Sequence, residues 1–254
     1  MTDGETAAMT SILRAFEVIN ALWETKGAGP SELAARMDVP KSTAHVYLRT
    51  LEETGYVINE GGEYSLGYRF LTTGSRIKHR NGLFQASERL LKDLAAQTDE
   101  LVTLVVEQDG KAVILHKEFG NRSLELGIYS GMTTPLHTNA TGKAILAFLP
   151  DERTDEILDA HGLPQVTEQT ITDEAVLRAE LATIREDGCA VDWEQQVTGM
   201  GLIGAPIVVD ERVAGAVGIV CPTGRLQNEA YQQRLVRKLR ETIDAITIKY
   251  RYGN

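Results

Sequence analysis

The stretch PSELAARMDVPKSTAHVYLRTLEETGYVINEGGEYSL, residues 30–66, contains two short helical patterns, a tight turn and a hairpin. Pro30 and Ser31 supply the start and the N-cap of a first helix, and Pro40 ends it because proline cannot continue a helix. A second helix follows, with apolar side chains at i, i+3, i+4 and i+7, namely Ala44, Tyr47, Leu48 and Leu51. Two strands then flank a turn at 59–62, whose glycines tolerate positive φ. This order predicts a winged helix-turn-helix, a fold whose second helix reads DNA.

An amphipathic segment precedes this stretch and predicts one more helix. Its apolar residues fall on a single helical stripe, and they are Met9, Ile12, Leu13, Phe16, Ile19, Leu22 and Trp23. We expect this stripe to complete a small three-helix core. The alternative is an ordinary subdomain in which a helix pair and a hairpin pack together without any role in DNA binding.

The second helix carries the candidates for contact with DNA, which are Lys41, Ser42, Thr43, His45, Tyr47 and Arg49. Short polar or charged groups in the first turn of such a helix meet phosphates and base edges in the major groove. We expect Thr43 and His45 to meet base edges, and Lys41 and Arg49 to lie nearer the phosphates. The expected partner is therefore an operator in double-stranded DNA.

The net charge of −10 is unfavourable for binding a polyanion unless the cations gather on one face. Residues 1–80 carry nine Lys and Arg against ten Asp and Glu, so most of the acidity lies in residues 81–254. Four cations lie within or next to the predicted DNA-binding stretch, namely Arg36, Lys41, Arg49 and Arg69, and a basic run follows at 76–80. A basic contact surface is thus available.

The length of 254 residues suits one small and one medium domain. The sequence has no run of eighteen apolar residues, and its acidic N-terminus lacks the basic start of a signal peptide. We therefore expect a cytoplasmic protein with no membrane partner. Cys189 and Cys221 show neither CxxC spacing nor a neighbouring His, so neither a disulfide framework nor a metal site is indicated, and two small buried side chains are expected.

Beyond a DNA-binding domain at 1–74, the chain predicts a linker helix at 75–99 and an α+β domain at 100–254. Gly82 predicts a bend or a break in the linker helix. The last domain is expected to contain strands at 101–107, 112–118, 123–130, 190–192, 201–209 and 213–220, and helices at 141–149, 151–160, 174–187 and 228–250. Without regular alternation of strand and helix, this pattern favours an α+β sensor domain with an antiparallel sheet.

Several segments together carry a family resemblance, namely SELAARMDVPKSTAHVYLRTLEETGYV at 31–57, YSLGYRFL at 64–71, PLHTNATGKAILAFLP at 135–150, GCAVDWEQQVTGMGLIGAPIVV at 188–209 and VAGAVGIVCPTGRL at 213–226. In this order and spacing they resemble the IclR family of transcriptional regulators. In that family a winged helix-turn-helix is followed by a GAF-like effector-binding domain. The resemblance covers nearly the whole chain.

The resemblance implies a homodimer or a dimer of dimers that binds a palindromic operator and responds to a small organic acid. It also implies control of a catabolic or carbon-metabolism operon. The effector pocket is implied between the helix that opens at Asn139 and the strands after Asp192. Position by position, its walls are implied to be Leu126, Ala140, Thr141, Asp192, Leu202, Ile219 and Cys221.

The sequence departs from the family pattern in two places. Val46 stands where the family usually has a basic residue, which alters the set of side chains that read bases. Leu202 and Ile219 stand where small polar or thiol groups commonly line the pocket, which favours a less polar effector.

Physical reasoning also indicates a ligand site near residues 138–142. These residues precede an apolar helical run, and the free backbone N–H groups at a helix N-terminus attract carboxylates. Ordinary capping without a ligand is the alternative. Asp192 follows an apolar strand, where it can accept hydrogen bonds from an effector hydroxyl or simply be a solvated loop carboxylate.

One motif favours an enzyme, because residues 199–204, GMGLIG, match the GxGxxG spelling of dinucleotide-binding folds. That fingerprint needs a helix opening at the glycines, whereas Pro206 and the β-branched residues 207–209 follow here. The sequence also contains no GxSxG or HExxH motif. We expect no catalytic activity and no cofactor. A sensor or interaction module without DNA binding, and a nucleotide-dependent enzyme, stay open as alternatives.

Overall fold

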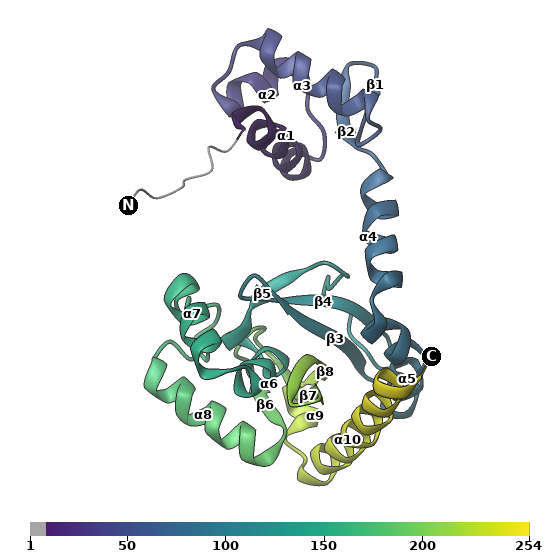
Figure 1. Ribbon diagram of the computed structural model, residues 1–254, viewed down its shortest axis with the longest axis vertical. Coiled ribbons are helices and arrows are strands. Elements are labelled where there is room, and N and C mark those ends of the chain that lie inside the picture. Colours follow the sequence, from purple (N-terminus) through teal and green to yellow (C-terminus); the bar gives the residue numbers. More distant parts are fainter. Residues whose placement is uncertain (1–8, 254) are drawn as a thin grey trace. The chain divides into compact units, whose positions relative to one another are not determined.

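The computed structural model describes residues 9–253, which form two compact units divided between Ile77 and Lys78 (Figure 1). The acidic segment at 1–8, on which the expectation of no signal peptide depends, lies outside the described residues. Within the described part, no helix is long and apolar enough to cross a membrane.

The first unit is a three-helix bundle with a hairpin. Its elements are α1 (Thr10–Thr25), α2 (Pro30–Met37), α3 (Lys41–Glu53), β1 (Val57–Glu60) and β2 (Glu63–Leu66). Pro30 is the first helical residue of α2 and Gly29 takes the N-cap position, so the prediction of Ser31 as N-cap was wrong. Asp38, in the left-handed region at φ 51°, makes the turn into α3. Leu33, Leu48 and Val57 are fully buried in the shared core, which confirms the winged helix-turn-helix pattern.

The predicted apolar stripe of α1 is only partly used in this core. Val18, Ala21 and Leu22 are buried, but five residues of the stripe are exposed, namely Met9, Ile12, Leu13, Phe16 and Trp23. The expectation that the whole stripe completes the core was therefore wrong. The helix is longer than the small core beneath it, so a second apolar face is left uncovered by the described residues of this unit.

Two helices replace the single predicted linker helix. These are α4 (Arg69–Arg80), which begins six residues earlier than expected, and α5 (Gly82–Thr98). The chain breaks between them at Asn81, whose side chain accepts a hydrogen bond from the Phe84 N–H at 3.1 Å and so caps α5. The bend or break that Gly82 predicts is confirmed as a break next to that residue.

The second unit contains a six-stranded antiparallel sheet, in the order β5-β4-β3-β8-β7-β6. The strands are β3 (Leu101–Gln108), β4 (Lys111–Glu118), β5 (Thr133–Pro135), β6 (Ala190–Trp193), β7 (Met200–Val209) and β8 (Arg212–Pro222). The register shifts between Leu104 and Val105 of β3, which leaves Leu115 unpaired and makes a bulge in β4. Strands and helices segregate rather than alternate, which confirms the predicted α+β class.

Helices cover both faces of this sheet (Figure 1). On one face α5 and α10 (Glu229–Tyr252) pack against side chains such as Leu104, Ile203 and Val217. On the other face lie α6 (Ala140–Phe148), α7 (Asp151–His161) and α8 (Glu174–Asp187), which pack near Val105 and Ala216. A short 3-10 helix, η1 (Leu136–Thr138), precedes α6, and the short helix α9 (Thr223–Leu226) precedes α10.

One predicted strand does not form. Residues 119–132, which include the expected strand at 123–130, contain neither helix nor strand. Strand β5 starts only at Thr133 and pairs with β4 through three residues. Leu126, Ile128 and Met132 of this segment instead line a cavity, described below, whereas Leu124 is exposed. The alternation therefore does not reflect sheet pairing.

Two glycines let α6 lie directly on the sheet. Gly204 of β7 faces Gly218 of β8, and a Cβ at Gly204 would sit 2.6 Å from the backbone of Ala140 and Thr141. A Cβ at Gly218 would sit 2.5 Å from the Thr141 side chain. The glycines of the GMGLIG motif therefore belong to a strand and its preceding turn, and no helix opens there.

A polar contact joins the end of α4 to the sheet. Lys78 Nζ lies 2.8 Å from His116 Nδ1, and His116 Nε2 lies 2.8 Å from Glu118 Oε1. The bulge in β4 lets His116 face α5, where its ring also meets the edge of Phe84. We refer to these three residues as the Lys78–His116–Glu118 contact.

Candidate functional site

Helix α3 presents a continuous exposed stripe to solvent. Ala44 and Leu48 point into the core of the first unit, and the opposite side carries Lys41, Ser42, His45, Val46 and Arg49, all exposed. These positions are spaced by three or four residues, which places them on one helical face. Four of the six predicted DNA contacts lie on this stripe, while Thr43 and Tyr47 are half-buried at its edges.

Val46 lies at the middle of the exposed stripe, with 63% of its surface accessible. It was treated above only as a departure from a family pattern and not as a contact residue. Helical spacing alone places it beside Ser42 and Arg49. An apolar side chain at this place is suited to contact with the methyl group of thymine.

Several cations of the first unit are engaged within the protein. Arg36 pairs with Glu24, and Arg69 donates to the Thr54 carbonyl while lying 5.2 Å over the Tyr56 ring. Arg49 Nη2 is 3.9 Å from Glu53 Oε1 across an exposed surface, which is a weak pair. Of the four predicted cations, Lys41 and Arg49 therefore remain the ones directed to solvent from α3.

The hairpin is acidic at its tip. Glu60 and Glu63 flank the turn and are exposed, and strands β1 and β2 contain no Lys or Arg. Asn59 Oδ1 accepts the Gly62 N–H at 2.9 Å, which holds the turn closed. Carboxylates repel phosphates, so this hairpin is poorly suited to contact with a nucleic-acid backbone.

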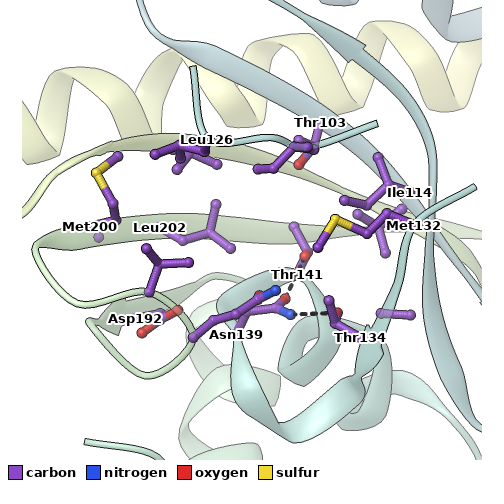
Figure 2. Close-up of a pocket in the computed structure, with 17 residues that line it drawn as sticks. Thr103, Ile114, Leu126, Met132, Thr134, Asn139, Thr141, Asp192, Met200 and Leu202 are labelled. Atoms are coloured by element: carbon purple, nitrogen blue, oxygen red, sulfur yellow. Dashed lines mark hydrogen bonds between the residues drawn. The ribbon is translucent and has the colours of Figure 1, made fainter. Parts of the chain in front are cut away.

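A cavity of about 80 Å³ lies in the second unit between the sheet, the start of α6 and the segment 119–132 (Figure 2). This volume is enough for several water molecules or a small organic molecule. Most of the lining is apolar, and the lining residues are Thr103, Val105, Ala112, Ile114, Leu126, Ile128, Met132, Thr134, Asn139, Thr141, Asp192, Gln196, Val197, Met200, Gly201, Leu202 and Val220. We call this cavity the effector pocket, after the role that the family resemblance implies for it.

The start of α6 is organised by one buried asparagine. Asn139 Oδ1 accepts the Gly142 N–H at 2.9 Å and the Thr141 hydroxyl at 2.7 Å, and its Nδ2 donates to Thr134 Oγ1 at 3.2 Å. Figure 2 shows Asn139, Thr134 and Asp192 along one side of the cavity and Leu126 on the opposite side. The helix end is therefore capped by the protein itself, and the cap also fixes the polar wall of the pocket.

Asp192 is a buried carboxyl group on β6, with 3% of its surface exposed. Its Oδ1 accepts the Gln195 N–H at 2.8 Å. Burial raises the pKa of Asp192 to about 6, and the nearby Glu180 raises it further, while the Gln195 hydrogen bond and Lys143 act in the opposite direction. Asp192 is thus no solvated loop carboxylate.

Lys143 is fully buried behind this wall. Its Nζ donates to Glu180 Oε1 and, at 2.7 Å, to Gln195 Oε1. Because the charge of Lys143 is paired with Glu180, it stabilises the local fold and does not face the cavity as a free cation.

The structure brings four of the seven predicted pocket residues to this cavity, namely Leu126, Thr141, Asp192 and Leu202. The other three are placed elsewhere. Ile219 and Cys221 are fully buried against α5 and α10, because alternate residues of β8 face opposite sides of the sheet and Val220 is the one that lines the pocket. Ala140, the first residue of α6, packs against Gly204 of β7.

The remaining lining residues were missed by sequence reasoning. Ile114 and Thr103 alternate with core residues along their strands, so a correct register would have identified them. Met200, at the start of β7, also lines the pocket. Residues 9–253 contain no cluster of His, Cys, Asp and Glu that could hold a metal ion.

Comparisons with known proteins point to one family. The model of the IclR helix-turn-helix domain matches residues 11–60, and that of the bacterial transcriptional regulator IclR C-terminal domain matches residues 76–248. The chain is similar to a probable HTH-type transcriptional regulator ArcR of Halobacterium salinarum, with 34% identity over 252 residues, 97% of this chain and 96% of the relative.

Solved structures show the same likeness. Thermotoga maritima IclR has a TM-score of 0.80 and 29% identity, covering 96% of this chain and all of that one. An IclR homologue from Microbacterium hydrocarbonoxydans, crystallised with 4-hydroxybenzoate, has a TM-score of 0.80 at 23% identity, covering 96% of this chain and 98% of that one. The latter likeness shows the fold.

Proposed function

Because this chain belongs to the IclR family of transcriptional regulators, which bind DNA and are not enzymes, we propose that a small molecule in the effector pocket controls how tightly it binds its operator. The observation that carries the proposal is that one chain contains both an exposed helix face suited to DNA and a cavity suited to a small molecule. The first unit exposes the stripe of α3, and the second encloses a largely apolar cavity. We further propose that it acts in the cytoplasm on a metabolic operon.

Recognition of the operator would depend on the exposed stripe of α3. Ser42, His45 and Val46 would meet base edges in the major groove, and Lys41 and Arg49 would meet phosphates. Thr43 and Tyr47, both half-buried, would support the stripe from its edges. The acidic hairpin would stay away from the backbone, which leaves α3 to supply most of the specificity.

The effector would be a small organic molecule with an apolar body. The homologue from Microbacterium hydrocarbonoxydans binds 4-hydroxybenzoate, a molecule of this kind. An organic acid, the class that the family resemblance implies, would have to direct its carboxylate toward the start of α6, because Asp192 occupies the other part of the polar wall.

The uncovered face of α1 supports a homodimer. Ile12, Leu13, Phe16 and Trp23 each expose more than half of their surface on one helix. An apolar patch of this kind on a small domain commonly marks a protein interface. Two copies joined through α1 would present two α3 helices to the two halves of a palindromic operator.

The test is a titration of the purified protein against the intergenic DNA upstream of its own gene, followed by fluorescence anisotropy at several salt concentrations. We expect specific binding that weakens as salt rises, because cations on α3 displace counterions from the phosphates. Lys41→Ala and Arg49→Ala should each weaken binding and reduce the salt dependence by about one unit of slope. Lys92→Ala, at an exposed position of α5, is the matched control and should bind normally.

Two results would contradict the proposal. If the protein binds unrelated DNA as tightly as the intergenic DNA, and the α3 substitutions have no effect, the stripe does not read DNA. If the protein binds the operator but no metabolite extract or small-molecule library changes its affinity, the pocket is not an effector site.

A further inference from the structure

The effector pocket offers one strong hydrogen-bond acceptor that the protein does not use. Asp192 Oδ1 accepts the Gln195 N–H, while Oδ2 has no hydrogen-bond partner among residues 9–253. By contrast, the polar atoms around Asn139 are largely occupied by one another. Asp192 and Asn139 lie on the same side of the cavity in Figure 2. A ligand would therefore meet a carboxyl oxygen that is free to accept a hydrogen bond, next to an asparagine whose own amide atoms are already engaged.

The charges around the pocket disfavour an anion. None of its lining residues is Lys, Arg or His. Lys143, the cation that acts on Asp192, is itself paired with Glu180, and both groups lie behind the wall. His137, whose pKa is lowered by burial, carries no charge near neutral pH. With Asp192 ionised, these groups together carry a net negative charge.

We propose that the effector is an uncharged, compact apolar molecule with a hydroxyl or N–H group that donates a hydrogen bond to Asp192 Oδ2, and that carboxylates of the same size bind more weakly. This assignment of the ligand class rests on the proposed function, because it assumes that the cavity is the effector site. A hydrogen bond to an ionised acceptor is among the stronger ones that proteins make. A ligand carboxylate would instead place a second negative charge in a medium of low dielectric constant.

The side-chain composition of the cavity supports an apolar body. Ile114, Leu126, Ile128 and Met132 come from β4 and the segment 119–132, and Met200 and Leu202 come from β7. These side chains make no hydrogen bonds, so the part of the ligand that touches them is expected to be hydrocarbon.

The test uses the full-length protein and three apolar bodies, isobutyl, cyclohexyl and phenyl, each carrying a hydroxymethyl, a carboxamide or a carboxylate group. Calorimetric titration at pH 7.5 gives the Kd of all nine compounds. For the body that binds best, we expect the alcohol or the amide to bind at least about ten-fold more tightly than the carboxylate. Operator binding is measured in parallel with each compound.

Asp192→Asn separates the role of the carboxyl group from that of shape. We expect this variant to bind the alcohol about ten-fold more weakly and the carboxylate more tightly than wild type does. The preference for the alcohol over the carboxylate should therefore fall or reverse. Asp159→Asn, the same change at an exposed position of α7, should leave the preference as it is.

The outcomes distinguish this proposal from the proposed function. If the carboxylate binds as tightly as the alcohol and the amide and changes operator affinity, the cavity is an effector site but our assignment of the ligand class is wrong. A preference that survives unchanged in Asp192→Asn contradicts the assignment as well. If none of the nine compounds binds or alters operator affinity, the effector role of the cavity fails together with the assignment.

Discussion

At the scale of single residues, Asp192 holds a charge in a place where the folded protein disfavours it. The carboxyl group is buried beside the pocket, and its pKa of about 6 lies above the value of about 4 for an unfolded Asp. The folded state therefore binds a proton more tightly than the unfolded state. It follows that the contribution of Asp192 to stability is full below about pH 4 and is lost as the pH rises through about 6.

Asp192→Asn should therefore stabilise the protein at neutral and basic pH. A shift of about two pKa units corresponds to about 3 kcal/mol, so the free energy of unfolding of the variant, relative to wild type, should rise by up to about 3 kcal/mol between pH 4 and pH 8. Urea denaturation at four or five pH values in this range measures the difference. Asp159→Asn, which is exposed, should give a flat difference, and a flat difference for Asp192→Asn would show that its burial has no energetic effect.

Residue-level predictions from the sequence succeeded where the signal was local. Thr141 was identified at a predicted helix start and Asp192 after a predicted apolar strand, and both line the pocket. Ile219 and Cys221 were placed on the wrong side of β8, because a shift of one residue in a strand exchanges its two faces. In a strand buried on both faces, such as β8, hydrophobicity does not reveal which side chains face the cavity.

At the scale of elements, the contact between α6 and the sheet depends on the absence of side chains. Gly204→Ala would place a methyl group 2.6 Å from the backbone of α6, which cannot move aside as a flexible side chain would. We expect a loss of about 1–3 kcal/mol in the free energy of unfolding, or more if the helix is displaced. Chemical denaturation measures the loss.

Gly224→Ala is the matched control for this substitution. Gly224 lies in α9, and a methyl group added there would meet no atom of a neighbouring element within 4 Å, so the same added atom should leave stability unchanged or raise it slightly. Equal effects of the two substitutions would show that the close approach of α6 and β7 is not what the glycine provides.

The Lys78–His116–Glu118 contact joins the end of α4 to the strand that also carries Ile114 into the pocket. If the effector acts on operator binding through β4, Lys78→Met should leave effector affinity unchanged and reduce the effect of the effector on operator affinity. A change of about 0.5–2 kcal/mol in the coupling free energy is expected, which is about two-fold to thirty-fold. Operator titrations with and without effector measure the coupling.

Lys92→Met, an exposed position of α5, is the control for this substitution. A coupling that stays at its wild-type value in Lys78→Met would mean that the signal does not pass through this contact.

Element-level prediction failed at 123–130 for a physical reason. Alternation of apolar and polar residues indicates a chain with one buried side, and a strand is the commonest way to achieve this. Here Leu126 and Ile128 are half-buried and line a cavity, and the backbone around them is not paired in the sheet. By contrast, Pro40 predicted the end of one helix and Gly82 a bend or break in another, and the structure has a helix end at Asp38 and a break at Asn81.

At the scale of the whole molecule, the exposed face of α1 predicts an assembly. Phe16→Ser would replace an apolar side chain that is 59% exposed, so the fold of the single chain should be little affected. If α1 joins two copies, the variant should shift toward monomer in sedimentation experiments at micromolar concentration and should bind a palindromic operator at least ten-fold more weakly.

Glu17→Ser changes the neighbouring exposed position on α1 and serves as the control. It should keep the assembly of the wild type. If the Phe16→Ser protein sediments as the same oligomer as wild type and binds the operator with the same affinity, this face is not the interface.

The sequence predicted the order of the two units, because each contains strong local signals. It did not predict that most of the α1 stripe is uncovered, since periodicity shows that a helix has an apolar face but does not show whether the same chain covers it. It also suggested more cations for contact with DNA than α3 offers, because pairs such as Arg36 with Glu24 are brought together only by folding.

The two boundaries of the effector pocket differ in how firmly they are built. On one side α6 rests closely on Gly204 of β7 and Gly218 of β8, whereas on the other the segment 119–132 follows no regular backbone pattern. Replacements at Leu126 or Ile128 can reshape the cavity without disturbing the sheet. A regulator built in this way can acquire a new inducer over evolutionary time by exchanging a few residues of one loop, while its rigid floor and its stability are inherited unaltered.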